Sequence, residues 1–121
     1  MAASRFQLCE ELSFISMVHE FGIMPVDPQP GKRYDAYEPQ KYGCITVHDD
    51  LVEIFEPKLV EMPCYWHTLD RPEAGLAYCG ITLIPPDSLA VFAKAVGEIE
   101  PLQELIRKAA AEKKFIIHFG L

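Results

Sequence analysis

Two short apolar segments near the end of the chain constrain the fold most strongly. GITLI (residues 80–84) and FIIHF (residues 115–119) are rich in β-branched and aromatic residues, which predicts two strands. The residues between them show helical spacing, which predicts helices packed on a sheet. We therefore predict an α+β fold, in which residues 1–121 form a single domain with a small mixed β-sheet covered by helices. If the two strands are parallel, the helices between them form a right-handed crossover.

Proline and glycine mark the ends of these two helices. The motif PPDS (residues 85–88) supplies preset φ angles and side-chain oxygens that accept early backbone donors, so a helix should follow it. Gly97 is placed to end that helix, and Pro101 to begin the next. The second helix carries its basic residues in its second half, where they complement the negative end of the helix dipole.

The first half of the chain gives weaker indications. Apolar residues recur at helical spacing over residues 4–21, which predicts a helix, with a strand as the alternative for the first few residues. Residues 25–43 hold four prolines and three tyrosines, which predicts an ordered surface loop anchored by its aromatic rings. CITVH is either a short strand or the approach to a helix. A helix is then expected near residues 49–56, with a turn or short helix near 57–62.

The aromatic segment PCYWHTL reads as a strand bounded by Pro63 and by the turn signal DRPEAG. The second apolar segment, LAYCGITLIPP, follows that turn. We expect the two strands to pair as a hairpin, because Pro72 and Gly75 are turn formers.

The charge of the chain limits its partners. Eighteen acidic residues against eleven basic ones give a formal net charge of −7. No basic cluster exceeds a pair of residues, so binding to nucleic acid is not expected, because it requires a basic surface. No apolar run reaches the length of a membrane span, and the first residues do not resemble a secretory signal. We therefore expect a cytoplasmic protein with a basic protein partner.

Four cysteine and histidine residues have spacings that suggest a zinc site: Cys44 and His48, and Cys64 and His67. The aromatic residues of CYWH favour an extended backbone, however, and residues three apart in a strand point to opposite faces. We therefore interpret all four cysteines of the chain as reduced, mostly buried thiols, and we expect no metal and no cofactor.

The established catalytic motifs are also missing. The sequence holds no GxGxxG, no Walker loop, no GxSxG and no HExxH. His118 lies in an apolar strand, which favours a hydrogen-bonded core residue over a catalytic base. The alternative hypothesis is a small hydrolase-like or zinc-dependent enzyme that uses His48, His67 and Cys64.

An acidic segment gives the leading functional hypothesis. Asp49, Glu53 and Glu56 share one face of the expected helix, and Asp50 lies beside them. Acidic residues near aromatic ones are typical of a surface that binds a basic protein, although a solvated helix face has the same pattern. We expect these four carboxylates to bind the partner, with Tyr42 as an aromatic anchor.

The run YCGITLIPPDSL, two helices and the terminal KKFIIHFGL together give the chain a family resemblance. It resembles the single-domain acidic immunity proteins that accompany bacterial polymorphic or contact-dependent toxins. The resemblance covers the C-terminal half of the chain. It implies a non-enzymatic inhibitor that binds a cognate toxin in the cytoplasm. We expect the chain to act by occlusion of the toxin, as a monomer or homodimer.

Overall fold

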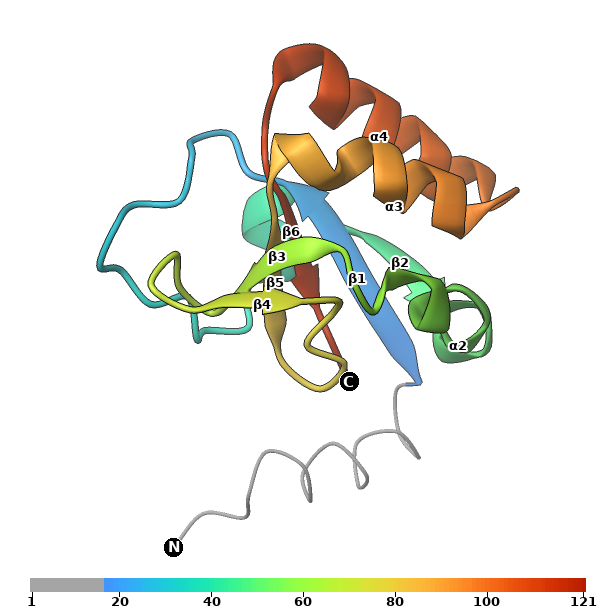
Figure 1. The fold of residues 1–121 in the computed structure, drawn as a ribbon, viewed down its shortest axis with the longest axis horizontal. Coiled ribbons are helices and arrows are strands. Elements are labelled where there is room, and N and C mark those ends of the chain that lie inside the picture. The colour runs from blue at the N-terminus through green and yellow to red at the C-terminus, as the bar shows by residue number, and fades with distance from the viewer. Residues whose placement is uncertain (1–16) are drawn as a thin grey trace, which may run out of the picture.

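The computed structural model describes residues 17–121, and Figure 1 shows the arrangement of the elements in this part of the chain. Its strands are β1 (Val18–Ile23), β2 (Ile45–His48), β3 (Pro63–Trp66), β4 (Pro72–Ala74), β5 (Ile81–Ile84) and β6 (Ile116–Phe119). Its α-helices are α2 (Asp49–Phe55), α3 (Leu89–Val96) and α4 (Glu100–Glu112). Short 3-10 turns are η1 (Pro39–Tyr42), η2 (Glu56–Leu59) and η3 (Pro86–Ser88).

The six strands form one sheet in the order β2-β1-β6-β5-β3-β4. This confirms the α+β class, but each of the five strand pairings is antiparallel, so the sheet is not mixed. The parallel crossover considered for β5 and β6 does not occur. The physical reason is that α3 leads away from the sheet and α4 returns beside it (Figure 1), so β6 starts where β5 ended, with Ile116 opposite Ile84.

The predicted helix boundaries in the second half are confirmed. Leu89 begins α3 directly after the PPDS turn, and Gly97 follows its end with a φ of 69°. Pro101 lies in the first turn of α4, where its missing N–H removes no helical hydrogen bond. The two strands predicted to form a hairpin do pair, as antiparallel β3 and β5. The turn prediction for DRPEAG is wrong, because Pro72 to Ala74 form the edge strand β4, which pairs with the other side of β3.

The helix predicted over residues 4–21 is wrong at its C-terminal end. Val18 to Ile23 form β1, which pairs with β2 on one side and β6 on the other. Two neighbouring strands satisfy the backbone of this segment, and this long-range pairing overrides its helical periodicity. Residues 4–16, the rest of that prediction, lie outside the described residues.

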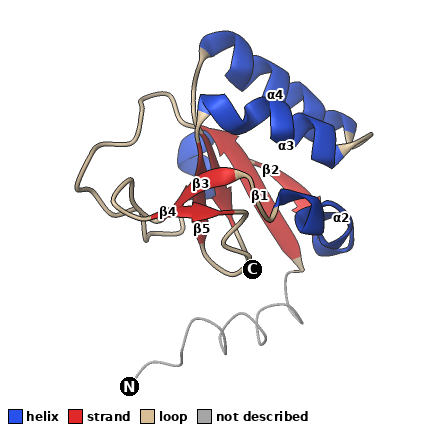
Figure 2. Cartoon of the chain, in the orientation of Figure 1, coloured by secondary structure: helices blue, strands red, loops and turns tan. Residues whose placement is uncertain are grey.

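The two faces of the sheet are covered differently. Directly opposed residues in antiparallel strands project to the same face, so the register places Phe21, His118 and Thr82 on one face. The helices α2, α3 and α4 pack on this face, which we call the helix face, and their buried residues form the larger apolar cluster with Phe21. Figure 2 shows α3 and α4 as a layer on the sheet.

The other face is covered by the loop of residues 24–44, and we call it the loop face. Its buried cluster contains Met24, Ile81, Leu83, Ile117 and Phe119, and the loop adds tyrosines to it. The predicted ordered loop is therefore confirmed. It reaches the sheet at Gly22, where an added Cβ would lie 2.6 Å from Cys44 Sγ and 2.8 Å from the Tyr42 carbonyl oxygen. Only glycine permits so close an approach.

Candidate functional site

Helix α2 has one buried and one exposed side, and it carries most of the predicted binding residues. Its buried residues are Asp49, Val52 and Phe55. On its outer side, Asp50 and Glu53 are exposed to solvent, and so are two large apolar side chains, Leu51 at 41% and Ile54 at 66%. We call the outer residues Asp50, Leu51, Glu53 and Ile54 the α2 surface.

Asp49 does not belong to this surface, which corrects the prediction that it binds a partner. Only 6% of the residue is exposed. Its Oδ1 accepts a hydrogen bond from His19 Nε2 at 2.9 Å and another from the Tyr78 hydroxyl. As the first residue of α2, Asp49 also adds a negative charge at the positive end of the helix dipole. It therefore fastens α2 to the sheet.

A series of buried polar contacts, which we call the polar chain, runs across the helix face from Asp49 through His19 and His118 to Thr82. His19 Nδ1 lies 2.9 Å from His118 Nε2 in the neighbouring strand. His118 Nδ1 lies 3.1 Å from Thr82 Oγ1, which also accepts a hydrogen bond from the Ala77 amide at 2.8 Å. The chain of contacts thus joins α2 to β1, β6 and β5. His19, His118 and Thr82 are fully buried.

One arrangement of protons satisfies every contact in this chain. The Asp49 carboxylate accepts from His19 Nε2–H, so neutral His19 has a free lone pair on Nδ1. His118 Nε2–H then donates to that lone pair, and the Thr82 hydroxyl donates to His118 Nδ1. Thr82 keeps a lone pair for the backbone N–H that it accepts. Both imidazoles are therefore neutral Nε2–H tautomers.

The electrostatics agree with this assignment. Burial lowers the pKa of His19, although the neighbouring Asp49 opposes the shift. Burial also lowers the pKa of His118 well below its usual value, and the nearby His19 adds to the effect. Burial by itself would raise the pKa of Asp49, but hydrogen bonds from Tyr78 and His19 outweigh it, and the pKa is lowered. The favoured state has one negative carboxylate and two neutral rings.

This arrangement is suited to holding structure rather than to catalysis. A histidine that acts as a general base needs a ring nitrogen free to face the substrate. In His19 and His118 all four ring nitrogens already contact another protein group. The sequence predicted His118 as a hydrogen-bonded core residue, which is confirmed. It missed His19, although the alternation of His19, Phe21 and Ile23 is a strand signal.

The remaining predicted partner-binding residues do not form one surface. Tyr42 lies on the loop face, half-buried, with its ring 6.1 Å from the Phe119 ring. The α2 helix packs on the opposite face through Val52 and Phe55, so Tyr42 is not an anchor beside it. Glu56 begins η2 and is half-buried. Of the residues predicted to bind a partner, Asp50 and Glu53 are therefore exposed on α2, and Glu56 lies next to them in sequence but is half-buried.

The three residues of the alternative enzyme hypothesis, His48, His67 and Cys64, do not form one site either. Cys64 is buried in the helix-face core, and burial raises its pKa to about 12. His67 Nδ1 lies 2.7 Å from an Asp35 oxygen, and its Nε2 accepts from the Ile81 amide at 3.3 Å. His48 is exposed and accepts a hydrogen bond from the Asp50 amide at the start of α2. Within residues 17–121, no three histidine, cysteine or acidic side chains are grouped to hold a metal ion.

The cysteines differ in state. Cys44 and Cys64 are free thiols, as predicted. Burial and the charge of Glu20 raise the pKa of Cys44 to about 12, so it is a poor nucleophile at neutral pH. The prediction of a reduced thiol is wrong for Cys79, which takes part in a disulfide.

No family model matches the chain, and no curated protein or solved structure matches it either. In the part of the chain that the structure describes, no helix combines the length and the apolar character needed to cross a membrane.

Proposed function

We propose that the chain is a non-enzymatic inhibitor of the immunity type, which binds a basic protein through the α2 surface. The observation that carries this proposal is the composition of that surface. Leu51 and Ile54, three residues apart on one helix, are exposed, and each directly follows an exposed acid, Asp50 or Glu53. A small apolar centre within a charged margin is the usual build of a protein interface.

Exposed apolar side chains are concentrated here. Among the described residues, seven large hydrophobic side chains are exposed, and three of them, Leu51, Ile54 and Val60, lie within ten residues of sequence. A single exposed leucine needs no explanation, but a group on one helix and the turn that follows it does. Binding of a partner would remove this apolar area from water.

The charges of the same segment favour a basic partner. Between residues 49 and 62, Lys58 is the only base, against five acids. Opposite charge on a partner speeds diffusional encounter, and the apolar centre then slows release. The net charge of −7 supports this attraction over longer distances.

The buried side of α2 contributes rigidity. Asp49 holds the first turn through His19 and Tyr78, while Val52 and Phe55 enter the core. A helix fixed in this way presents its outer residues in one geometry, so little conformational entropy is lost when a partner binds. The enzyme hypothesis has less support, because His48, His67 and Cys64 lie apart and contact other protein groups or the core.

The remaining parts of this proposal come from the sequence. The cognate toxin and a cytoplasmic location stay predictions, and so does the monomeric or dimeric state. Free thiols at Cys44 and Cys64 fit a reducing compartment, whereas a disulfide at Cys79 is more usual in an oxidising one.

Association kinetics test the proposal. The partner to test is the C-terminal domain of the protein encoded beside the gene of this chain, which the proposal expects to be the toxin. Reversing Asp50 and Glu53 to lysine should slow association at least tenfold at low salt and flatten its salt dependence. The matched control reverses two exposed acids of α4 and its preceding loop, Glu104→Lys with Glu98→Lys, which changes the net charge equally. Equal association rates for the two double variants would remove the α2 surface from the proposal.

A further inference from the structure

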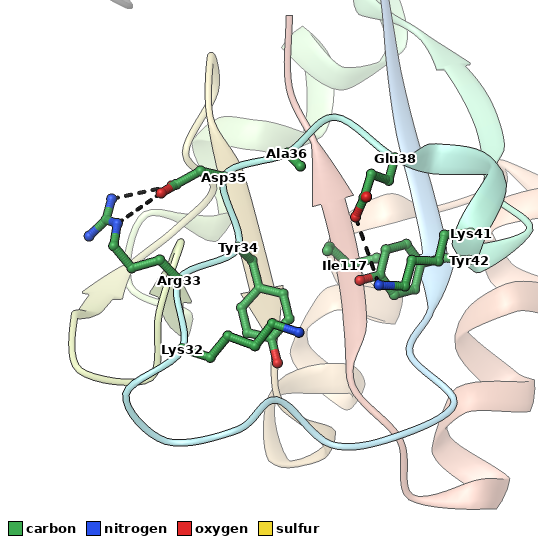
Figure 3. A pocket seen from close by; sticks show the side chains of 9 residues that line it. All are labelled: Lys32, Arg33, Tyr34, Asp35, Ala36, Glu38, Lys41, Tyr42 and Ile117. Atoms are coloured by element: carbon green, nitrogen blue, oxygen red, sulfur yellow. Dashed lines mark hydrogen bonds and ion pairs between the residues drawn. The ribbon is translucent and has the colours of Figure 1, made fainter.

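The loop face holds a pocket of about 250 Å³ whose lining differs from the rest of the surface (Figure 3). Loop residues 32–42 form its walls, and β6 forms its base. The residues that define it are Lys32, Tyr34, Glu38, Lys41, Tyr42 and Ile117. It lies across the sheet from the α2 surface, so the two sites are separate.

Two aromatic rings stand on either side of this pocket. Figure 3 shows the rings of Tyr34 and Tyr42 flanking it, with Ile117 of β6 behind them. Ile117 is 1% exposed, so the base is apolar and firmly packed. The Tyr34 hydroxyl accepts a hydrogen bond from the Gln29 amide at 2.9 Å, which fixes the orientation of its ring. Flat aromatic walls favour a flat ligand.

The wall that carries Tyr34 is fastened to the sheet. The Tyr34 amide donates a hydrogen bond to the His67 carbonyl oxygen at 2.6 Å. His67 Nδ1 also contacts the Tyr34 carbonyl oxygen at 3.2 Å and Asp35 at 2.7 Å. His67 has a φ of 65°, a backbone state that few residues other than glycine adopt. The Tyr34 wall is therefore in place before any ligand arrives.

Cations gather at this pocket in an otherwise acidic protein. Lys32, Arg33 and Lys41 line it, against Asp35 and Glu38. Arg33 is paired with Asp35 at 2.9 Å, which leaves the two lysines to balance one glutamate. Three of the eleven basic residues of a chain with net charge −7 thus lie within ten positions around one hollow.

The ammonium groups of the two lysines lie over the faces of the aromatic rings. Lys32 Nζ lies 5.0 Å from the centre of the Tyr34 ring, and Lys41 Nζ lies 5.8 Å from the centre of the Tyr42 ring. The contact of Lys41 with Glu38, at 3.8 Å between exposed groups, is weak. Both ammonium groups can therefore turn to an anion held between the rings.

We propose that this pocket binds a small aromatic carboxylate. The ring of the ligand lies between Tyr34 and Tyr42, above the buried Ile117, and the carboxylate receives hydrogen bonds from Lys32 and Lys41. Sites for drug-sized ligands usually measure about 300–1,000 Å³. A volume of about 250 Å³ therefore suits one ring or a fused pair and is too small for a nucleotide.

Indole-3-carboxylate is a suitable probe, followed through the backbone amide signals in NMR spectra of the full chain. The expected result is saturable shifts of the Tyr34, Tyr42 and Ile117 signals. Indole-3-carboxamide keeps the ring without the charge, and cyclohexanecarboxylate keeps the charge without the aromatic ring. Each should bind at least fivefold more weakly than the probe. Equal binding of either analogue, or no shift with the probe, would overturn the proposal.

Lysine variants locate the site. Lys32→Met and Lys41→Met should each weaken binding of indole-3-carboxylate at least threefold, and the double variant should weaken it further. Lys58→Met is the matched control, because Lys58 is an exposed lysine on η2 and does not line the pocket. It should bind the probe as the unchanged chain does. All three lysines are exposed, so these variants should keep the fold, which the unfolding midpoint checks. A loss in Lys58→Met equal to that in the pocket variants would contradict the assignment.

Discussion

The two faces of the sheet are built from the same strands but are stabilised in different ways. The helix face is covered by three helices, and its core contains the fully buried rings of Phe21, Phe55 and Phe92. The loop face has a smaller buried cluster under irregular chain, completed by half-buried tyrosines. Regular elements carry their own backbone hydrogen bonds, whereas the loop is held by a few backbone hydrogen bonds, such as that from the Tyr34 amide to the His67 carbonyl oxygen, and by contacts of its side chains with the sheet. The comparison indicates that most of the stability comes from the helix face.

Polar groups are distributed differently on the two faces. On the helix face they are buried and mutually satisfied, as in the chain from Asp49 to Thr82. On the loop face His67 is buried and paired, but the charged groups around the pocket are open to solvent, and Lys32 and Lys41 remain exposed. A satisfied buried network gives one rigid arrangement, whereas exposed charged groups stay free to exchange partners. The face that specifies the fold is thus distinct from the face that offers a small-molecule site.

The largest expected effect concerns core packing on the helix face. Phe92→Ala removes a fully buried ring that contacts both Phe21 and Phe55, and should lower the free energy of unfolding by about 3–5 kcal/mol. Tyr42→Leu, on the loop face, removes half-buried surface and should cost about 1 kcal/mol. Urea unfolding monitored by circular dichroism measures both. Equal losses would mean that the two faces contribute alike.

Parts of this difference could be predicted from the sequence. The helices α3 and α4 have local signals, because proline and glycine mark their ends and their apolar residues follow one period. The loop was also predictable, since prolines prevent a regular element there. Strand β1 was not, because its helical periodicity is outweighed by pairing with β2 and β6, which are distant in sequence.

The polar chain was beyond sequence reasoning for a related reason. His19 and His118 are 99 positions apart, and only the adjacency of β1 and β6 brings their rings together. Asp49 has the sequence surroundings of a solvated helix face, and its burial depends on the same strand order. The pocket, likewise, required knowing that residues 32–42 fold back over Ile117.

An intermediate effect is expected from the buried hydroxyl of the polar chain. Thr82→Val keeps the shape of the side chain but leaves His118 Nδ1 and the Ala77 amide without their partner. The free energy of unfolding should fall by about 1–3 kcal/mol, the usual cost of unsatisfied buried polar groups. Thr46→Val makes the same change at an exposed position of β2 and should cost less than about 0.5 kcal/mol. A similar result for both variants would show that the polar chain adds little stability.

The smallest effect is a dependence of stability on pH that belongs to the helix face. The pKa values of His19 and His118 are lowered in the folded protein, so the unfolded chain binds more protons below the ordinary histidine pKa of 6.5. Stability from these residues is complete above that pH and is lost as the pH falls below it. Asp49 also has a lowered pKa, and its contribution is lost only further into acid, below the ordinary carboxylate range.

Urea unfolding at pH 7 and at pH 6 measures this pH dependence. The free energy of unfolding should fall by at most about 1.4 kcal/mol between them, because each of the two histidines takes up about half a proton on average in the unfolded chain, and one proton accounts for about 1.4 kcal/mol per pH unit. His118→Gln removes one of the two groups and should flatten the slope, whatever its effect on stability at pH 7. The ring nitrogen signals of His118 give an independent measurement and should remain those of a neutral Nε2–H tautomer at pH 6. A His118 ring that is charged at that pH would contradict the proton arrangement. It would also mean that the pH dependence of stability does not come from neutral, buried histidines on the helix face.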